Sequence, residues 1–222
     1  MQVPDPDFSA SLQLQKTLTQ YRQQNISASM HAMKNRYSML HVDVLTLLYH
    51  FARHSPGPIL ELGTYVGGAT IALAWGVRDA GRPNRIVCVE PGGQHKHPKI
   101  PSKDILKDLR RNLKSEKADQ NVTIIEGYSW DEKARREVDA HLRPGEVALL
   151  IVDSDGCVAR DVASYRPLLA RDAVVVFDDY REQAGESKHS TAVPEVDALV
   201  ASGEVVPLGV YGWGTLFGRW RG

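Results

Sequence analysis

The amino-acid sequence predicts an α/β fold, a doubly wound and mostly parallel seven-stranded sheet with a C-terminal antiparallel hairpin and extra N-terminal helices. Five short β-rich runs are mostly apolar rather than alternating, which is typical of parallel strands buried on both faces. Amphipathic stretches separate these runs, as βαβ units require. The last two runs, 205–211 and 215–220, are joined by Gly212-Trp213-Gly214 without a helix, which indicates a hairpin.

The first 56 residues are predicted to be helical. Apolar side chains recur there at helical spacing, at Leu14, Leu18 and Tyr21 and again at Val44, Leu48 and Phe51. The breaker Ser55-Pro56-Gly57-Pro58 ends this region. We therefore expect an N-terminal helical cover over residues 1–56 and a core over residues 57–222, within one structural domain.

The core elements are expected to alternate along the chain. The strands are predicted at 59–62, 85–90, 122–126, 147–153 and 174–178, and the helices at 68–80, 102–117, 131–142, 158–169 and 192–201. Pro194 is expected in the first turn of the last helix, where its missing N–H costs nothing.

Composition excludes several classes of protein. The chain has 27 Lys+Arg and 27 Asp+Glu, so its formal net charge of zero argues against a dedicated nucleic-acid binder. Its apolar runs are far shorter than the ~18 residues of a membrane span. The first residues show no signal-peptide pattern. Only Cys88 and Cys157 are present, which excludes a disulfide scaffold and leads us to expect a cytoplasmic protein.

A glycine-rich turn follows the first predicted strand, in the sequence Glu61-Leu62-Gly63-Thr64-Tyr65-Val66-Gly67-Gly68-Ala69-Thr70. Tyr65 stands where the dinucleotide fingerprint G-x-G-x-x-G needs its second glycine, so a nicotinamide cofactor is disfavoured. The carboxylate of Glu61 before the first glycine suits a cationic or amine-bearing ligand better than a pyrophosphate. Glu90 ends the second strand, where an acid can accept both hydroxyls of a ribose.

These residues resemble a known family. The run 61–70 is similar to motif I of class I S-adenosylmethionine (SAM)-dependent methyltransferases, and most similar to the small metal-dependent O-methyltransferases of the catechol O-methyltransferase type. The resemblance extends from about residue 42 to the C-terminus and implies a Rossmann-like sheet. It places the glycine turn at the methionine end of SAM, Glu90 at the ribose and the turn 127–130 at the adenine. The residues it implies for cofactor binding are Glu61, Gly63, Thr64, Tyr65, Gly67, Glu90, Pro91, Tyr128, Ser129, Trp130 and Asp153.

Three acids are expected to gather at the carboxyl ends of two strands. Asp153 ends the fourth strand, and Asp178 and Asp179 end the fifth. Ligands of open parallel sheets bind at this edge. Unbalanced carboxylates there would repel one another, and Mg²⁺ prefers such oxygen ligands. The resembled family carries an Asp and an Asp-Asn or Asp-Asp pair at these strand ends, so we predict a metal site; capping of helices or loops is the structural alternative.

The general base is less clearly indicated. Catechol-type relatives carry a lysine three residues after the first metal aspartate, and Gly156 stands at that position here. Asp155 and His189 are the two candidate catalytic bases. Activation by the metal alone could suffice for an acidic phenol or enol.

The predicted function is therefore SAM-dependent methyl transfer to a hydroxyl of a small molecule, assisted by Mg²⁺, with no nucleic-acid or membrane partner. A homodimer is compatible with the sequence. Metal-independent methylation at O, N or C, an inactive SAM-binding protein and, less favoured, an NAD-dependent oxidoreductase are the alternatives. The basic segment 95–117 is interpreted as a solvated face rather than a site that recruits an anionic, carrier-bound substrate.

Overall fold

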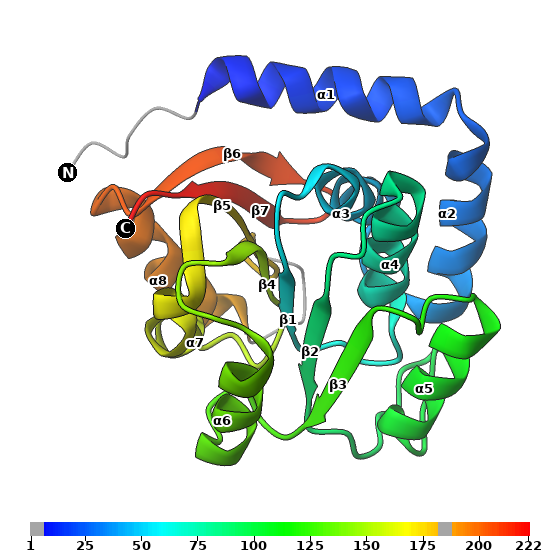
Figure 1. Ribbon diagram of the computed structural model, residues 1–222. Helices are drawn as coiled ribbons and strands as arrows, with labels where there is room; N and C mark the ends of the chain where they lie inside the picture. Colours follow the sequence, from blue (N-terminus) through cyan, green and yellow to red (C-terminus); the bar gives the residue numbers. More distant parts are fainter. Residues whose placement is uncertain (1–6, 182–187) are drawn as a thin grey trace.

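The computed structural model describes residues 7–181 and 188–222, with the side chain of His189 left out, and it confirms the predicted fold class (Figure 1). Helices flank one mixed seven-stranded sheet. Its elements are α1 (Phe8–Arg22), α2 (Asn25–Tyr37), α3 (Val42–His54), β1 (Ile59–Leu62), α4 (Gly68–Ala80), β2 (Ile86–Glu90), α5 (Ile105–Ser115), β3 (Val122–Glu126), α6 (Glu132–His141), β4 (Val147–Val152), α7 (Val158–Tyr165), a 3₁₀ turn (Arg166–Leu168), β5 (Leu169–Phe177), α8 (His189–Ala201), β6 (Val205–Tyr211) and β7 (Thr215–Trp220).

The strand order is β3-β2-β1-β4-β5-β7-β6. The first five strands of this order are parallel, and β7 runs antiparallel to both β5 and β6. The chain winds from β1 toward β3 and then returns to place β4 on the other side of β1. Open α/β sheets bind ligands at such a reversal, beyond the carboxyl ends of the strands.

Side chains of the central strands alternate between two apolar layers. Ile59 of β1 faces the layer that contains α3, α4 and α5, whereas Leu60 and Leu62 face α6, α7 and α8. Every residue of β1, β2 and β4 is buried, because helices cover both faces. This double cover explains why the strands are mostly apolar. Among the described residues, no helix has the length and apolar character needed to cross a membrane.

The N-terminal helices add a further layer on one side of the sheet. α3 packs directly on α4, and Gly76 permits the contact because a methyl group there would overlap the carbonyl oxygen of Tyr49. α1 runs along the end of the molecule above β6 (Figure 1), and the Asp7 amide donates to the Pro207 carbonyl at 3.1 Å.

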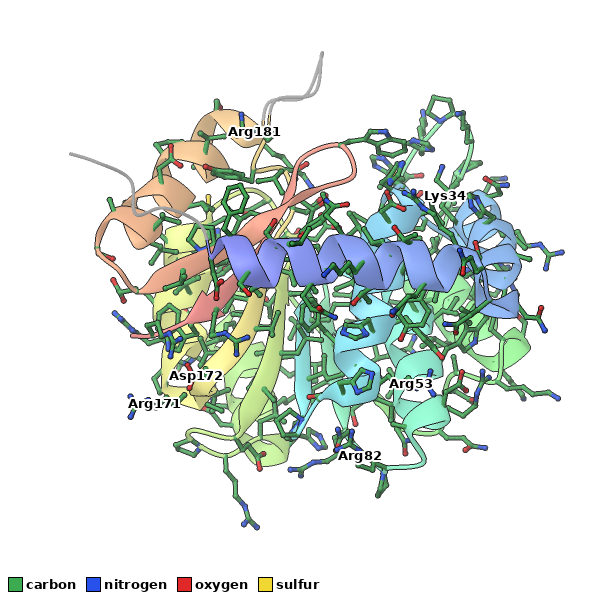
Figure 2. All side chains as sticks on the ribbon, turned by 90° about the horizontal axis from the view of Figure 1, so that it is seen from above. Lys34, Arg53, Arg82, Arg171, Asp172 and Arg181 are labelled. Atoms are coloured by element: carbon green, nitrogen blue, oxygen red, sulfur yellow. The ribbon has the colours of Figure 1, made fainter. Side chains whose placement is uncertain are left out.

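Figure 2 shows Lys34 and Arg181 on one side of α1, with Arg53, Arg82 and Arg171 on the other.

Several boundaries differ from the prediction, and those of β5, α7 and α8 are informative. β5 begins at Leu169 rather than 174, because a shift in register between Val147 and Leu149 lets the earlier residues join the sheet. The preceding α-helix ends at Tyr165, where a 3₁₀ turn that contains Pro167 follows. α8 begins at His189, so Pro194 lies inside the helix and not in its first turn. Proline has no N–H, so Pro194 donates no hydrogen bond to the first turn of the helix.

His50 of α3 packs against Tyr21 of α1, and its burial makes the stability of the protein depend on pH. Its ring lies 5.8 Å from that of Tyr21 and 4.7 Å from that of His54. Burial, with the charges of His54 and Arg53, lowers the pKa of His50 from 6.5 to about 4. The unfolded chain therefore takes up a proton more readily than the folded protein between these values, so stability falls as the pH drops from 6.5 toward 4.

We expect His50→Gln to remove this part of the acid sensitivity, on the order of 1–2 kcal/mol after screening by solvent. Urea unfolding of both proteins at pH 7.5 and pH 4.5 measures it. An equal loss of stability in the wild type and the variant over this range would contradict the role of His50.

Candidate active site

A cavity of about 410 Å³ opens at the carboxyl ends of β1, β2 and β4. It lies at the reversal of strand order, as expected for an open α/β sheet. Of the residues predicted to bind cofactor or act as base, those that line it are Gly63, Tyr65, Glu90, Pro91, Tyr128, Ser129, Trp130, Asp153 and Asp155. The structure therefore brings most of the predicted site together around one space.

The turn after β1 forms one wall of the cavity. Gly63 has a φ of +83°, and a methyl group at its Cα would overlap the carbonyl oxygen of Asp153. Glycine is thus required both by the left-handed backbone and by the close approach of the β4 loop. Tyr65 also has a positive φ, of +50°, and its hydroxyl donates to the carbonyl of Ile100. This bond ties the glycine turn to the segment before α5.

Glu90 holds the same turn from the end of β2. Its side chain is buried, and one carboxylate oxygen accepts the amides of Thr64 at 3.0 Å and Tyr65 at 2.8 Å. The other oxygen accepts the Gly92 amide at 2.9 Å. The Thr64 hydroxyl also donates to the first oxygen, at 3.4 Å. Each carboxylate oxygen accepts about two hydrogen bonds, so the oxygen that accepts the Gly92 amide is the one with a position left for a ligand in the adjoining cavity.

Three residues expected at the methionine end lie behind the cavity wall. Gly67 caps α4, Thr64 packs against Glu90, and Glu61 is fully buried beneath the turn. One oxygen of Glu61 accepts the hydroxyl of Thr70 at 2.8 Å and the thiol of Cys88 at 3.4 Å.

The other oxygen of Glu61, Oε1, has no hydrogen-bond partner. Burial raises the pKa of Glu61 to about 7, although the bonds from Thr70 and Cys88 oppose the shift. Glu61 does not line the cavity, so its predicted contact with the cofactor stays a prediction.

An aromatic pair marks the opposite end of the cavity. The half-exposed rings of Tyr128 and Trp130 stack with centroids 4.6 Å apart. The guanidinium of Arg160 lies over the indole of Trp130, 3.9 Å from its centroid. Asp161, which is fully buried, accepts Arg160 at 3.0 Å and the hydroxyl of Ser129 at 2.8 Å. α7 therefore fixes the turn between β3 and α6.

Arg160→Met is expected to weaken binding of S-adenosylhomocysteine (SAH) about 3- to 10-fold, because Trp130 loses its cation–π contact. Arg160→Lys should restore part of the affinity. Titration calorimetry measures both variants, with Arg136→Met, an exposed arginine of α6, as the control. Equal affinities for the Arg160 and Arg136 variants would show that the contact of Arg160 with Trp130 has no role in SAH binding.

The three predicted metal ligands form one cluster at the edge of the cavity. Asp153, Asp178 and Asp179 each place a carboxylate oxygen within 4.8 Å of the others. Thr215 of β7 donates to Asp178, and Asp179 has a φ of +58°. Burial and the charges of the neighbouring aspartates raise the pKa of Asp153 well above its usual range and that of Asp178 to about 6. Such mutual repulsion is typical of a site that a cation balances.

The two candidate bases are placed differently. Both oxygens of Asp155 bind Arg160, at 2.8 and 3.0 Å. Burial would raise the pKa of Asp155, but the bonds from Arg160 and the Cys157 amide outweigh it and lower the pKa. A carboxylate with a lowered pKa is a weak base, so the structure disfavours Asp155 in this role. His189 begins α8, but its side chain lies outside the described residues.

Sequence reasoning missed three charged residues of the site. Lys188 lines the cavity and places its Nζ 3.6 Å from an oxygen of Asp179. Arg160 and Asp161 hold the aromatic turn from α7. The chain offered one weak signal, an Asp-x₄-Arg-Asp run at 155–161 directly after the fourth strand. Lys188 had no such signal, because it lies in a polar loop.

Comparison with known proteins is consistent with this geometry. A family model described as a methyltransferase domain matches residues 60–180, more than half of the chain. The chain belongs to this methyltransferase family. The match confirms the identification as a class I SAM-dependent methyltransferase, and it removes the nicotinamide-dependent oxidoreductase as an alternative. No curated protein matches the sequence significantly.

Solved structures share the fold over nearly the whole chain. A protein assigned as a caffeoyl-CoA O-methyltransferase from Staphylococcus aureus has a TM-score of 0.65 at 16% identity, covering 96% of this chain and all of that one. The O-methyltransferase TomG from Streptomyces achromogenes, solved with SAM, has a TM-score of 0.60 at 16% identity, covering 100% and 93%. PaMTH1 from Podospora anserina, bound to SAH, has a TM-score of 0.59 at 17% identity over both full chains.

Proposed function

We propose that this methyltransferase transfers the methyl group of SAM to a hydroxyl oxygen of a small molecule, with Mg²⁺ held by Asp153, Asp178 and Asp179. One observation carries the proposal: Asp153 belongs both to the wall of the cofactor cavity and to the acidic cluster. A methyl acceptor beside the cluster would therefore lie next to the methyl donor. Orientation of two reactants in this way is a large source of rate enhancement.

The donor set of the cluster fits Mg²⁺. All three side chains offer carboxylate oxygens, which are the ligands that this ion prefers. A bound divalent ion supplies Lewis acidity that makes a nearby hydroxyl easier to deprotonate. Partial burial and the neighbouring negative charges raise the pKa values of Asp153 and Asp178, and this environment supports a positive partner at this place.

The surrounding residues divide the remaining tasks. Glu90 offers its carboxylate to the ribose hydroxyls while it holds the glycine turn in shape. The Tyr128–Trp130 pair offers an aromatic surface for the adenine. Tyr65 forms the wall between these two ends and is fixed there by its bond to Ile100.

The proposal extends to the setting of the reaction. The two cysteines, Cys88 and Cys157, are unpaired, which supports a reducing, cytoplasmic environment. The acceptor is a small molecule and neither nucleic acid nor membrane, in keeping with the balanced charge of the chain. A homodimer remains part of the proposal, and sedimentation velocity tests it.

Methyl transfer from labelled SAM to a panel of phenols, enols and sugar hydroxyls tests this function. We expect activity with at least one acidic hydroxyl in Mg²⁺ and its loss in EDTA. Asp178→Asn should lower kcat about 100-fold or more, because one ligand of the ion and a negative charge are lost. Asp139→Asn, an exposed acid of α6, is the control. Full activity in EDTA and in the Asp178 variant would favour the metal-independent alternative instead.

A further inference from the structure

Lys188 lies directly against the acidic cluster. Its ammonium nitrogen is 3.6 Å from a carboxylate oxygen of Asp179, which is itself nearly buried. The same side chain lines the cofactor cavity together with Asp153. The charge of Lys188 partly offsets the burial and repulsion that raise the pKa values of Asp153 and Asp178. The positive charge of Lys188 therefore partly neutralises the negative charge of the three carboxylates.

Gly156 allows the backbone of Lys188 to lie close to the β4 loop. Gly156 in the β4 loop has a φ of +89°, and a methyl group added there would lie 2.8 Å from the carbonyl oxygen of Lys188 and 3.2 Å from its Cα. A side chain at position 156 would thus push residue 188 away from the strand ends. The contact with Asp179 depends on two loops that meet without a side chain between them.

We propose that Lys188 is an internal counter-cation of the cluster and competes with the divalent ion for Asp179. This inference rests on the proposed metal site. An ammonium and a divalent ion cannot both approach one carboxylate oxygen closely without repelling each other. A divalent ion that takes the oxygen facing Lys188 must displace the lysine from Asp179, and the lysine keeps the affinity for the metal lower than three carboxylates alone would give.

Binding of Mn²⁺ to the full chain, followed by the electron paramagnetic resonance signal of the free ion, tests the competition in the presence of SAH. Lys188→Met is expected to bind Mn²⁺ about 10-fold or more tightly than the wild type, and Lys188→Arg to stay within about 3-fold of it. Lys107→Met removes an equal charge from the exposed face of α5 and should leave the affinity unchanged. Thermal unfolding shows that each variant is folded.

Unchanged or weaker Mn²⁺ binding in Lys188→Met would overturn the proposal, as would an equal gain in Lys107→Met, which would indicate a long-range effect of charge. Absence of binding in the wild type together with tight binding in Lys188→Met would support it strongly. Calorimetric binding of SAH and methyl transfer by the wild type test the proposed function separately. If Lys188→Met does not bind Mn²⁺ more tightly, but the wild type binds SAH and transfers the methyl group in a Mg²⁺-dependent way, only the role of Lys188 is wrong and the proposed function is unaffected.

Discussion

Replacement of Gly63 by alanine is expected to abolish SAH binding and to lower the free energy of unfolding by about 3 kcal/mol or more. The added methyl group would overlap the carbonyl oxygen of Asp153, and the backbone at this residue has a φ of +83°. Overpacking alone costs about 1–3 kcal/mol, and the left-handed conformation adds about 1 kcal/mol for a residue with a side chain. The neighbouring β4 loop would have to move, and with it the wall of the cavity.

Gly81→Ala is the matched control for this variant. Gly81 also has a positive φ, of +65°, but a methyl group there would meet no atom within 4 Å. We expect it to cost only about 1 kcal/mol and to leave SAH binding intact. Urea unfolding and titration calorimetry measure the two effects. Equal losses in both variants would show that the contact with Asp153 is unimportant.

Glu90→Ala is expected to lower the affinity for SAH about 100-fold or more. The variant removes the carboxylate proposed for the ribose hydroxyls, and hydrogen bonds to charged groups contribute about 1.5–3 kcal/mol each. It also releases the amides of Thr64 and Tyr65, so the glycine turn loses its support. Glu90→Gln keeps one acceptor oxygen and should lose less affinity than the alanine variant.

Glu126→Ala provides the control for Glu90. Glu126 ends β3, directly beside Glu90 in the register of the two strands, but its side chain is exposed and does not line the cavity. We expect calorimetry to show an SAH affinity within about 3-fold of the wild type for this variant. If Glu90→Ala also kept its affinity within this range, the ribose role of Glu90 would be wrong.

The features that the sequence could predict are those set by periodic or short-range patterns. The apolar runs of the central strands follow from burial on both faces, and the Gly212–Gly214 turn indicates the hairpin directly. Asp153 and Asp178 could be placed together because parallel strands end at one edge of the sheet.

Other features depend on contacts between segments far apart in the chain. The start of β5 at Leu169 follows from a register shift opposite Val147, which no local pattern encodes. Lys188 reaches the cluster only because Gly156 leaves space for its backbone. The pairing of Asp155 with Arg160 likewise depends on how α7 begins, and it turned a candidate base into a carboxylate with a lowered pKa.

A crystal structure of the protein with SAH and Mn²⁺, recorded with anomalous diffraction from the metal, tests the proposed metal-assisted transfer most directly. We predict SAH in the cavity with its ribose at Glu90 and a strong anomalous peak within ligand distance of Asp153, Asp178 and Asp179. SAH bound in the cavity with no anomalous peak at the three aspartates, in crystals soaked to saturation with Mn²⁺, would contradict it.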